Sequence, residues 1–343
     1  MLRQDTMALP ETSMRRPSRR ALIGSLPLLA GLPAARAAAP AYPATPVTLV
    51  VPFSAGGAAD IAARLLARHA PRHLPNPAAT LRVENRAGAS GALGTLAVAR
   101  ARPDGQTLLL ARVASSAILP ATDPRTPYAW DEFSMLGLLE ETPFIICVRE
   151  DSPFETLRDL LNTLREKPGT ASFATTGPAT LLDLGIRHLF ATAGLPIDAG
   201  LATPFRGGGE AVAALIEGRV QFLGTNLSDA LPSLKAGRLR GLAIGTPERL
   251  RILPAVPTAR EAEVPGLASV TGWSALFGPP GLEEEPARAW IAALAALRQD
   301  KAWQDGVQAT GGIPRLLGPQ GTRDFLATQM AFYRELGRRL GLI

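Results

Sequence analysis

The chain alternates between short apolar runs, which predict buried strands, and stretches with apolar residues at helical spacing. The run 47–51 (VTLVV) is followed after a short loop by the amphipathic stretch 58–69. The same order of strand, loop and helix recurs as far as residue 244. This alternation with short connections favours an α/β fold with a mostly parallel sheet that is covered on both faces.

The pattern sets approximate bounds for the predicted elements. Strands are expected at 47–51, 80–84, 107–111, 144–148, 171–174, 220–223, 239–244 and 268–277. Helices are expected at 58–69, 95–101, 157–166, 181–193, 210–217, 228–236, 286–297, 301–309 and 321–340. Strand-like sequence ends near residue 280, so we expect the helices of the tail to cover a sheet that is formed earlier in the chain.

Length and composition point to a globular protein with two domains. The chain has 343 residues, of which 46% are hydrophobic and 19% are charged. No internal repeat is visible. Aromatic residues make up 5% of the chain, which leaves little material for stacking on nucleic-acid bases.

The N-terminal segment has the features of an export signal. A basic stretch at 15–20 precedes the apolar run 21–32, and 35–37 (ARA) fits the rule for signal cleavage. The motif 18–23 (SRRALI) matches a twin-arginine signal. Because the apolar run is too short to cross a bilayer, we predict that residues 1–37 are a cleaved signal peptide and that the protein is periplasmic.

Removal of residues 1–37 lowers the net charge from +6 to +2, because the segment holds six arginines and two acidic residues. A nucleic-acid partner is therefore not expected. Cys147 is the single cysteine, which excludes an intrachain disulfide and is typical of a buried structural thiol. His69 and His73 are four residues apart, but Pro71 interrupts the helix between them, so no metal or cofactor site is predicted.

The first candidate binding loop follows the strand expected at 47–51. It consists of Phe53, Ser54, Ala55, Gly56 and Gly57. The first amides of the following helix have no partner within the helix, and the helix dipole adds positive charge there, so such a turn can bind an anion. The loop matches neither of the glycine-rich nucleotide motifs. A tight turn that merely requires small residues is the alternative interpretation.

A second loop of the same kind lies between the strand expected at 171–174 and its helix. Its Thr175, Thr176, Gly177 and Thr180 offer hydroxyl and amide donors, and Thr180 is also a suitable helix cap. A third turn, around Ser90, resembles the nucleophile elbow of hydrolases, but Ala92 replaces the last glycine of that motif.

Several collinear stretches resemble the solute receptors of tripartite tricarboxylate transporters, often called Bug receptors. They are 51–60 (VPFSAGGAAD), 83–91 (VENRAGASG), 102–109 (RPDGQTLL), 167–169 (KPG), 204–207 (PFRG), 237–240 (GRLR), 256–258 (VPT), 264–266 (VPG), and Trp273 before Gly278 and Pro279. The resemblance extends from about Pro46 to the C-terminus.

The resemblance implies a periplasmic-binding-protein-like fold, in which two α/β lobes are joined by two crossing strands and the ligand lies between them. In this chain, 41–142 and 265–343 would form lobe one, and 143–264 would form lobe two. The stretches 144–148 and 268–277 would be the crossing strands.

The resemblance also implies that backbone amides of the two loops hold a ligand carboxylate. Ser90, Ser115 and Phe205 fall where pocket-lining residues are expected. Asp183 stands where the family commonly has a histidine, so it either receives an ammonium or hydroxyl group or complements the dipole of its helix. Asp60 either braces the first loop or contacts the ligand.

These observations together predict an exported receptor, without catalytic residues or a cofactor, that captures a small organic carboxylate. We expect a monomer that delivers this ligand to membrane transport subunits. Two alternatives remain open at this stage: a sensor that uses the same fold to signal to a membrane partner, and an exported hydrolase that acts on carboxylates.

Overall fold

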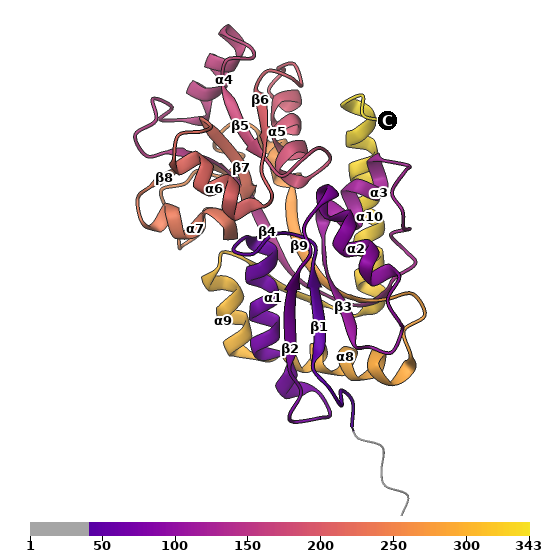
Figure 1. Cartoon of the computed structure of the whole chain (residues 1–343). Helices are drawn as coiled ribbons and strands as arrows, with labels where there is room; N and C mark the ends of the chain where they lie inside the picture. Colours follow the sequence, from indigo (N-terminus) through magenta and orange to yellow (C-terminus); the bar gives the residue numbers. More distant parts are fainter. Residues whose placement is uncertain (1–40) are drawn as a thin grey trace, which may run out of the picture. The chain divides into compact units, whose positions relative to one another are not determined.

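The computed structural model describes residues 41–343, so the signal peptide expected at 1–37 lies outside the described residues. The fold is mixed α/β, as the sequence predicted (Figure 1). The strands are β1 (Val47–Val51), β2 (Leu81–Asn85), β3 (Thr107–Arg112), β4 (Ser134–Arg149), β5 (Ser172–Thr175), β6 (Leu201–Pro204), β7 (Phe222–Asn226), β8 (Leu239–Ile244), β9 (Thr271–Gly278) and β10 (Ile313–Leu317). The helices are α1 (Ala58–His69), α2 (Ala92–Ala99), α3 (Leu119–Thr122), α4 (Leu157–Glu166), α5 (Leu181–Thr192), α6 (Gly208–Ile216), α7 (Leu227–Lys235), α8 (Glu284–Leu297), α9 (Lys301–Ala309) and α10 (Pro319–Arg339).

Strand β4 belongs to two sheets in succession. Its first part pairs with β9 as far as Pro143, which lies opposite Thr271, and it also pairs with β10. From Phe144 onward it pairs with β7 and β8. We call the sheet of β2, β1, β3, β9, β10 and the first part of β4 the first sheet. The second sheet contains the last part of β4 with β8, β7, β5 and β6.

The prediction of a mostly parallel sheet is wrong, because both long central strands run antiparallel to their neighbours. Parallel pairing joins β1 to β2 and β3, and β5 to β6 and β7. Every pairing of β4 and β9 is antiparallel. Strands β4 and β9 run opposite to the neighbouring strands β3 and β7, which belong to the strand–helix repeats of the two sheets.

One strand is longer than expected, and two further strands were not expected. The strand expected at 144–148 is only the second part of β4, because Glu140 and Glu141 interrupt the apolar pattern of its first part. Strand β10 lies beyond residue 280, where no further strand was expected, and β6 was not expected either. Both have exposed or partly exposed residues, so neither shows the apolar run of a buried strand.

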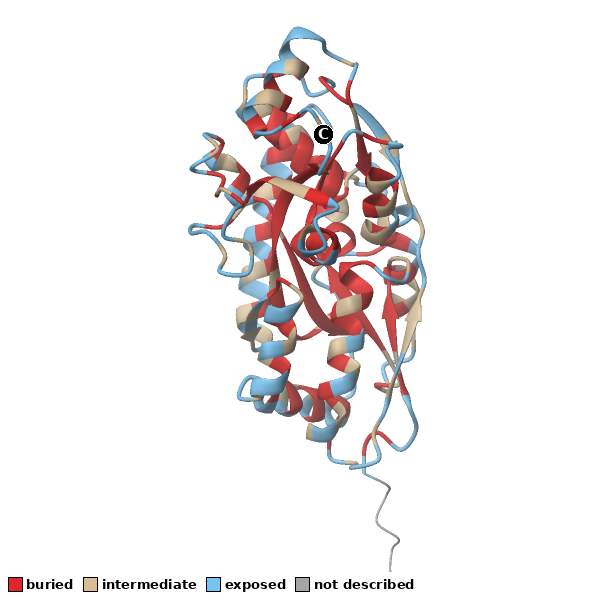
Figure 2. Cartoon of the chain, turned by 90° about the vertical axis from the view of Figure 1, so that its left-hand side faces the viewer, coloured by how far each residue is buried: buried red, intermediate tan, exposed pale blue. Residues whose placement is uncertain are grey.

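The strands form the interior and the helices cover them. Figure 2 shows the central strands as buried, and the outward faces of many helices as exposed. Helices α8 and α10 contact the first part of β4, α9 contacts β10, and α5, α6 and α7 pack on strands of the second sheet. The tail helices therefore cover the first sheet, as the sequence predicted.

No helix in residues 41–343 is long and apolar enough to cross a membrane. The same residues contain no cluster of three or more His, Cys, Asp or Glu side chains that is suited to a metal ion. Cys147 is buried within β4, and burial raises the pKa of its thiol.

His188 on α5 is buried against the turn before β9. Its Nε2 lies 3.0 Å from the carbonyl oxygen of Gly266, and burial lowers its pKa below the ordinary value of 6.5. On lowering the pH, the His188 imidazole of the unfolded chain therefore takes up a proton at a higher pH than the imidazole of the folded chain does. Acid then favours unfolding through this group.

We expect the free energy of unfolding to fall as the pH drops below about 6.5, by at most about 1.4 kcal/mol per pH unit from His188. A His188→Gln variant keeps a donor for the Gly266 carbonyl group, so its stability should decline less over the same range. Urea denaturation of both proteins at several pH values between about 7.5 and 5 measures the difference. Equal declines in the two proteins would contradict this role of His188.

Candidate functional site

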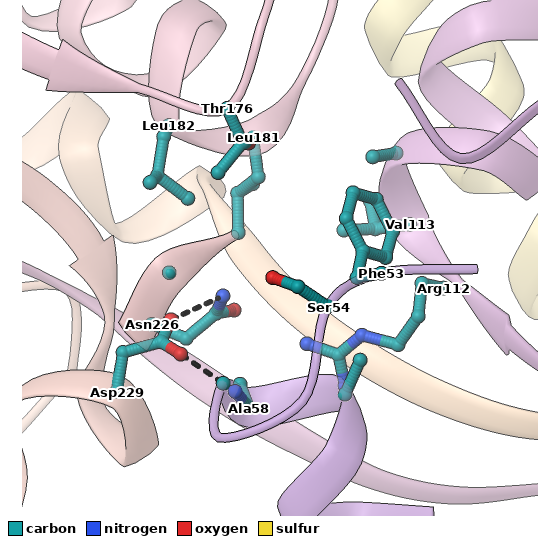
Figure 3. Close-up of a pocket in the computed structure, with 14 residues that line it drawn as sticks. Phe53, Ser54, Ala58, Arg112, Val113, Thr176, Leu181, Leu182, Asn226 and Asp229 are labelled. Atoms are coloured by element: carbon teal, nitrogen blue, oxygen red, sulfur yellow. Dashed lines mark hydrogen bonds between the residues drawn. The ribbon is translucent and has the colours of Figure 1, made fainter. Parts of the chain in front are cut away.

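The predicted loops of the two sheets face a common cavity of about 430 Å³, including the part that opens to solvent. Phe53, Ser54 and Gly57 from the first loop line it, and Thr176 from the second loop lies on another side. A neighbouring hollow shares Phe53 and Thr176 with the cavity. The structure therefore brings the two loops to the same place, as Figure 3 shows for Ser54, Phe53 and Thr176.

The neighbouring hollow contains three further expected residues, Ser90, Gly177 and Phe205. The Ser90 hydroxyl donates a hydrogen bond of 2.8 Å to the carbonyl oxygen of Pro178, so the third turn contacts the second loop directly. That hydroxyl is bonded to a backbone carbonyl and not to a histidine. This geometry does not supply the base that the hydrolase alternative requires.

The remaining expected residues lie outside the cavity lining. They are Ala55, Gly56, Asp60, Ser115, Thr175, Thr180 and Asp183. Thr175 and Thr180 donate hydrogen bonds to the carbonyl oxygen of Gly177, at 3.0 and 2.9 Å, and so fix the shape of the second loop. Ser115 is fully buried.

Both aspartates that were singled out in the sequence form local ion pairs. Asp60 accepts hydrogen bonds from the Gly56 amide (3.0 Å) and from Arg64 (2.8 Å), which braces the first loop. Asp183 accepts one from Arg187, also on α5, at 2.9 Å. Burial raises the pKa of Asp183 although Arg187 opposes the shift.

Arg112, at the end of β3, was not expected in the site and is its main positive charge. The residue is only 4% exposed, and it lines the cavity. Its Nη1 donates to Ser274 Oγ on β9, and that hydroxyl donates to Oε1 of Glu140 on β4 at 3.0 Å. Burial lowers the pKa of Arg112, and the carboxyls of Glu140 and Asp229 oppose this shift. An arginine side chain keeps its charge in proteins, so the cavity has a buried cation.

Asp229, in the first turn of α7, is the negative counterpart on the other side. Its Oδ1 accepts a hydrogen bond of 2.6 Å from the amide of Ala58, the first residue of α1. Its Oδ2 accepts from the Thr225 hydroxyl at 2.8 Å and from Asn226 Nδ2 at 3.2 Å. The Asp229 carboxylate on α7 thus accepts a hydrogen bond from an amide at the start of α1 that has no partner within its own helix.

The Asp229 carboxylate requires glycine at the start of α6. A Cβ atom added at Gly208 would overlap with the carboxyl group of Asp229. A Cβ at Gly57 would lie 3.3 Å from its Oδ1, which is a tight contact. The absence of side chains at these two positions allows the helix starts of α1 and α6 to approach one carboxylate closely.

The polar groups of the cavity point toward one another. Figure 3 shows the Ser54 hydroxyl and the Arg112 guanidinium directed into the same space, while the Asn226 amide nitrogen is turned toward Asp229. Val113, Leu181 and Leu182 form an apolar part of the lining. A cavity with an apolar wall and a few convergent polar groups is the common form of a small-molecule binding site.

Comparisons with known proteins agree over most of the chain. The family described as "Tripartite tricarboxylate transporter family receptor" matches residues 62–340. BugT of Bordetella pertussis is 31% identical over 328 residues, which cover 94% of this chain and 97% of BugT.

Solved structures show the same fold. The periplasmic binding protein BugD has a TM-score of 0.81 at 27% identity, with 88% of this chain and 99% of BugD covered. MatC from Rhodopseudomonas palustris, solved with bound malate, has a TM-score of 0.79 at 27% identity, with 86% and 100% covered. These likenesses confirm the periplasmic-binding-protein-like fold that the sequence predicted.

We expect Gly208→Ala to lower the free energy of unfolding by about 1–3 kcal/mol, because the new methyl group must displace the Asp229 carboxylate. Gly318→Ala is the matched control, since a Cβ atom there meets nothing within 4 Å. The control should stay within about 0.5 kcal/mol of the parent protein. Urea denaturation measures both variants, and equal stabilities would show that Asp229 is not confined by Gly208.

Proposed function

The chain belongs to the tripartite tricarboxylate transporter family of receptors, and on this premise we propose that it captures a small organic carboxylate outside the cytoplasm. The family description covers residues 62–340. The similar protein MatC was solved with malate, a carboxylate. The cavity of this chain supports the same class of ligand, because it contains a buried arginine.

The Arg112 guanidinium is the observation that carries this proposal. It has five N–H donors, and its hydrogen bond to Ser274 uses one of them. A ligand carboxylate in the cavity would accept from Arg112 and from the Ser54 hydroxyl. Hydrogen bonds to a charged acceptor contribute about 1.5–3 kcal/mol each, and micromolar affinity requires about 8 kcal/mol. The loop amides, which the family resemblance implied as partners of the carboxylate, would then bind it together with Arg112.

We further propose that the two lobes predicted from the sequence, 41–142 with 265–343 and 143–264, close around the ligand. Two observations support this division. Strand β4 changes sheets between Pro143 and Phe144, and a hydrogen bond between Ala58 on α1 and Asp229 on α7 joins a helix of one lobe to a helix of the other beside the cavity. The closed form would be the one that membrane transport subunits recognise.

Export belongs to the same proposal. The basic and apolar segments within residues 1–37 support cleavage near Ala37 and a periplasmic location. A receptor in that compartment meets its ligand before the transport subunits do.

Arg112→Gln should weaken binding of organic acids by at least about tenfold, because it removes a charged hydrogen-bonding partner of the carboxylate. Arg82→Gln is the control, since the Arg82 side chain is 71% exposed and lies outside the cavity lining. A thermal-shift screen of organic acids, including malate and adipate, identifies ligands; a concentration of 100 times the dissociation constant adds about 2.7 kcal/mol of stability.

Titration calorimetry with the best acid then compares the three proteins. The proposal predicts that the Arg82 variant binds like the parent protein and that the Arg112 variant does not. Equal affinities in both variants would contradict the role of Arg112, and no stabilisation by any acid would contradict the proposed ligand class.

A further inference from the structure

Glycines of the two lobes contact each other directly. Gly57 ends the first loop of lobe one, whereas Gly207 and Gly209 stand at the start of α6 in lobe two. A Cβ atom added at Gly57 would lie 3.3 Å from the amide nitrogen of Gly209, and one added at Gly209 would lie 3.0 Å from the carbonyl oxygen of Gly56. The two backbones are therefore in close contact. We call these four residues, Gly56, Gly57, Gly207 and Gly209, the glycine seam.

The backbone conformation of lobe two does not explain why glycine stands at 207 and 209. Gly207 has a φ of −172°, which any residue adopts, and Gly209 lies within α6, where alanine is the better helix former. The atoms nearest to a Cβ at Gly207 belong to Ser54, and those nearest to a Cβ at Gly209 belong to Gly56 and Gly57. It is therefore the contact with lobe one that requires the absence of side chains at both positions.

Two hydrogen bonds within the chain also join the lobes. The Ala58 amide of lobe one donates to Oδ1 of Asp229 in lobe two at 2.6 Å (Figure 3). The Ser90 hydroxyl of lobe one donates to the carbonyl oxygen of Pro178 in lobe two at 2.8 Å. Each bond joins two groups of the protein, so neither bond depends on a ligand.

Unusual backbone conformations flank the second of these bonds. Ala89 and Ser90 have φ values of 48° and 55°, and Ala179, next to Pro178, has a φ of 54°. Residues other than glycine seldom adopt the left-handed region, because Cβ then crowds the backbone. Such conformations persist where surrounding contacts enforce them. The contact between the lobes is therefore built into the shape of both turns.

Opposite charges on the two lobes face the same cavity. Arg112 stands on β3 of lobe one and Asp229 on α7 of lobe two, and both line the cavity. The Asp229 carboxyl opposes the fall in the pKa of Arg112 that burial causes, so the two charges attract each other across this space. Asp229 also lies at the start of α1, where the helix dipole favours a negative charge.

We propose that the glycine seam and the Asp229 carboxylate hold the two lobes together without a ligand, so that the closed form is the resting form of this receptor. The inference rests on the two lobes of the proposed function, but not on the class of ligand. Opening of the lobes is then the step that must precede binding. The ligand adds its contacts to a closure that the chain already favours.

Small-angle X-ray scattering by the exported protein tests this inference. Partial unfolding, dialysis and refolding remove any bound small molecule, and native mass spectrometry confirms the removal. We expect the scattering curve of the ligand-free protein to fit the structure described here. A curve that requires separated lobes would overturn the inference.

A double substitution tests the glycine seam. Gly207→Ala with Gly209→Ala places two methyl groups against lobe one, so the radius of gyration should increase. Gly318→Ala with Gly321→Ala is the matched control, because it makes the same changes at the N-cap and in the first turn of α10. A Cβ atom at Gly318 meets nothing within 4 Å, and one at Gly321 makes an ordinary contact of 3.4 Å with Leu317. The control should scatter like the parent protein.

Asp229→Asn tests the charge. It keeps the shape of the side chain and removes the negative charge between α1 and Arg112, so the ratio of closed to open protein should fall by about tenfold. Circular dichroism verifies that each variant is folded. If the double variant does not fold, the scattering of the parent protein and of the Asp229 variant still decides.

The results bear on closure separately from the ligand class. If the ligand-free parent protein is closed and both the seam variant and the Asp229 variant open, the inference is supported. A seam variant that scatters like the parent protein would contradict the role of the glycines, and an Asp229 variant that does so would contradict the role of the carboxylate. None of these measurements uses a ligand, so their failure would leave the carboxylate receptor to be tested by its own binding experiments.

Discussion

The structure depends on one strand that must serve two sheets. Strand β4 pairs with β9 up to Pro143 and with β7 from Phe144, and the partner of Phe144 in that register is Asn226. The last residue of β7 is thereby placed beside the point where the chain passes from sheet to sheet. Strand β3 ends at Arg112 and β7 ends at Asn226, three residues before Asp229. The polar groups of the cavity therefore gather where these strands end.

This arrangement explains how charges can lie inside the protein. Arg112, Ser274 and Glu140 stand on three adjacent strands of the first sheet and form one hydrogen-bonded chain. Burial raises the pKa of Glu140, and Arg112 and Ser274 oppose that shift. On the other side, Asp229 is stabilised by an amide at the start of α1. Each charge thus has partners on one side and faces the cavity on the other.

Much of the fold could be predicted from local sequence, because most buried strands and amphipathic helices have a clear period. The loop at Phe53–Gly57 was recognisable as a candidate because its small residues stand between a clear strand pattern and a clear helix pattern. Elements that lack such a period, such as β10 and the first part of β4, were missed. Antiparallel pairing across the crossing was also out of reach, since it depends on residues that are distant in the chain.

The charged residues of the site illustrate the same limit. Arg112 ends an apolar run and Asp229 stands in the first turn of a helix, and both positions are ordinary for such residues. Their place in the site depends on partners that are distant in the chain: Ser274, 162 positions from Arg112, and Ala58, 171 positions from Asp229. In contrast, Asp60 and Asp183 drew attention in the sequence, yet each forms an ion pair four residues away on its own helix.

The central claim is that a carboxylate binds between the two sheets at Arg112. A crystal structure with the tightest-binding acid tests it most directly. The account predicts carboxylate oxygens within hydrogen-bonding distance of the Arg112 guanidinium, with Ser54 and Asn226 on either side. A ligand bound elsewhere, such as the hollow beside Arg240 and Arg249, with the Arg112 cavity free of ligand, would contradict it.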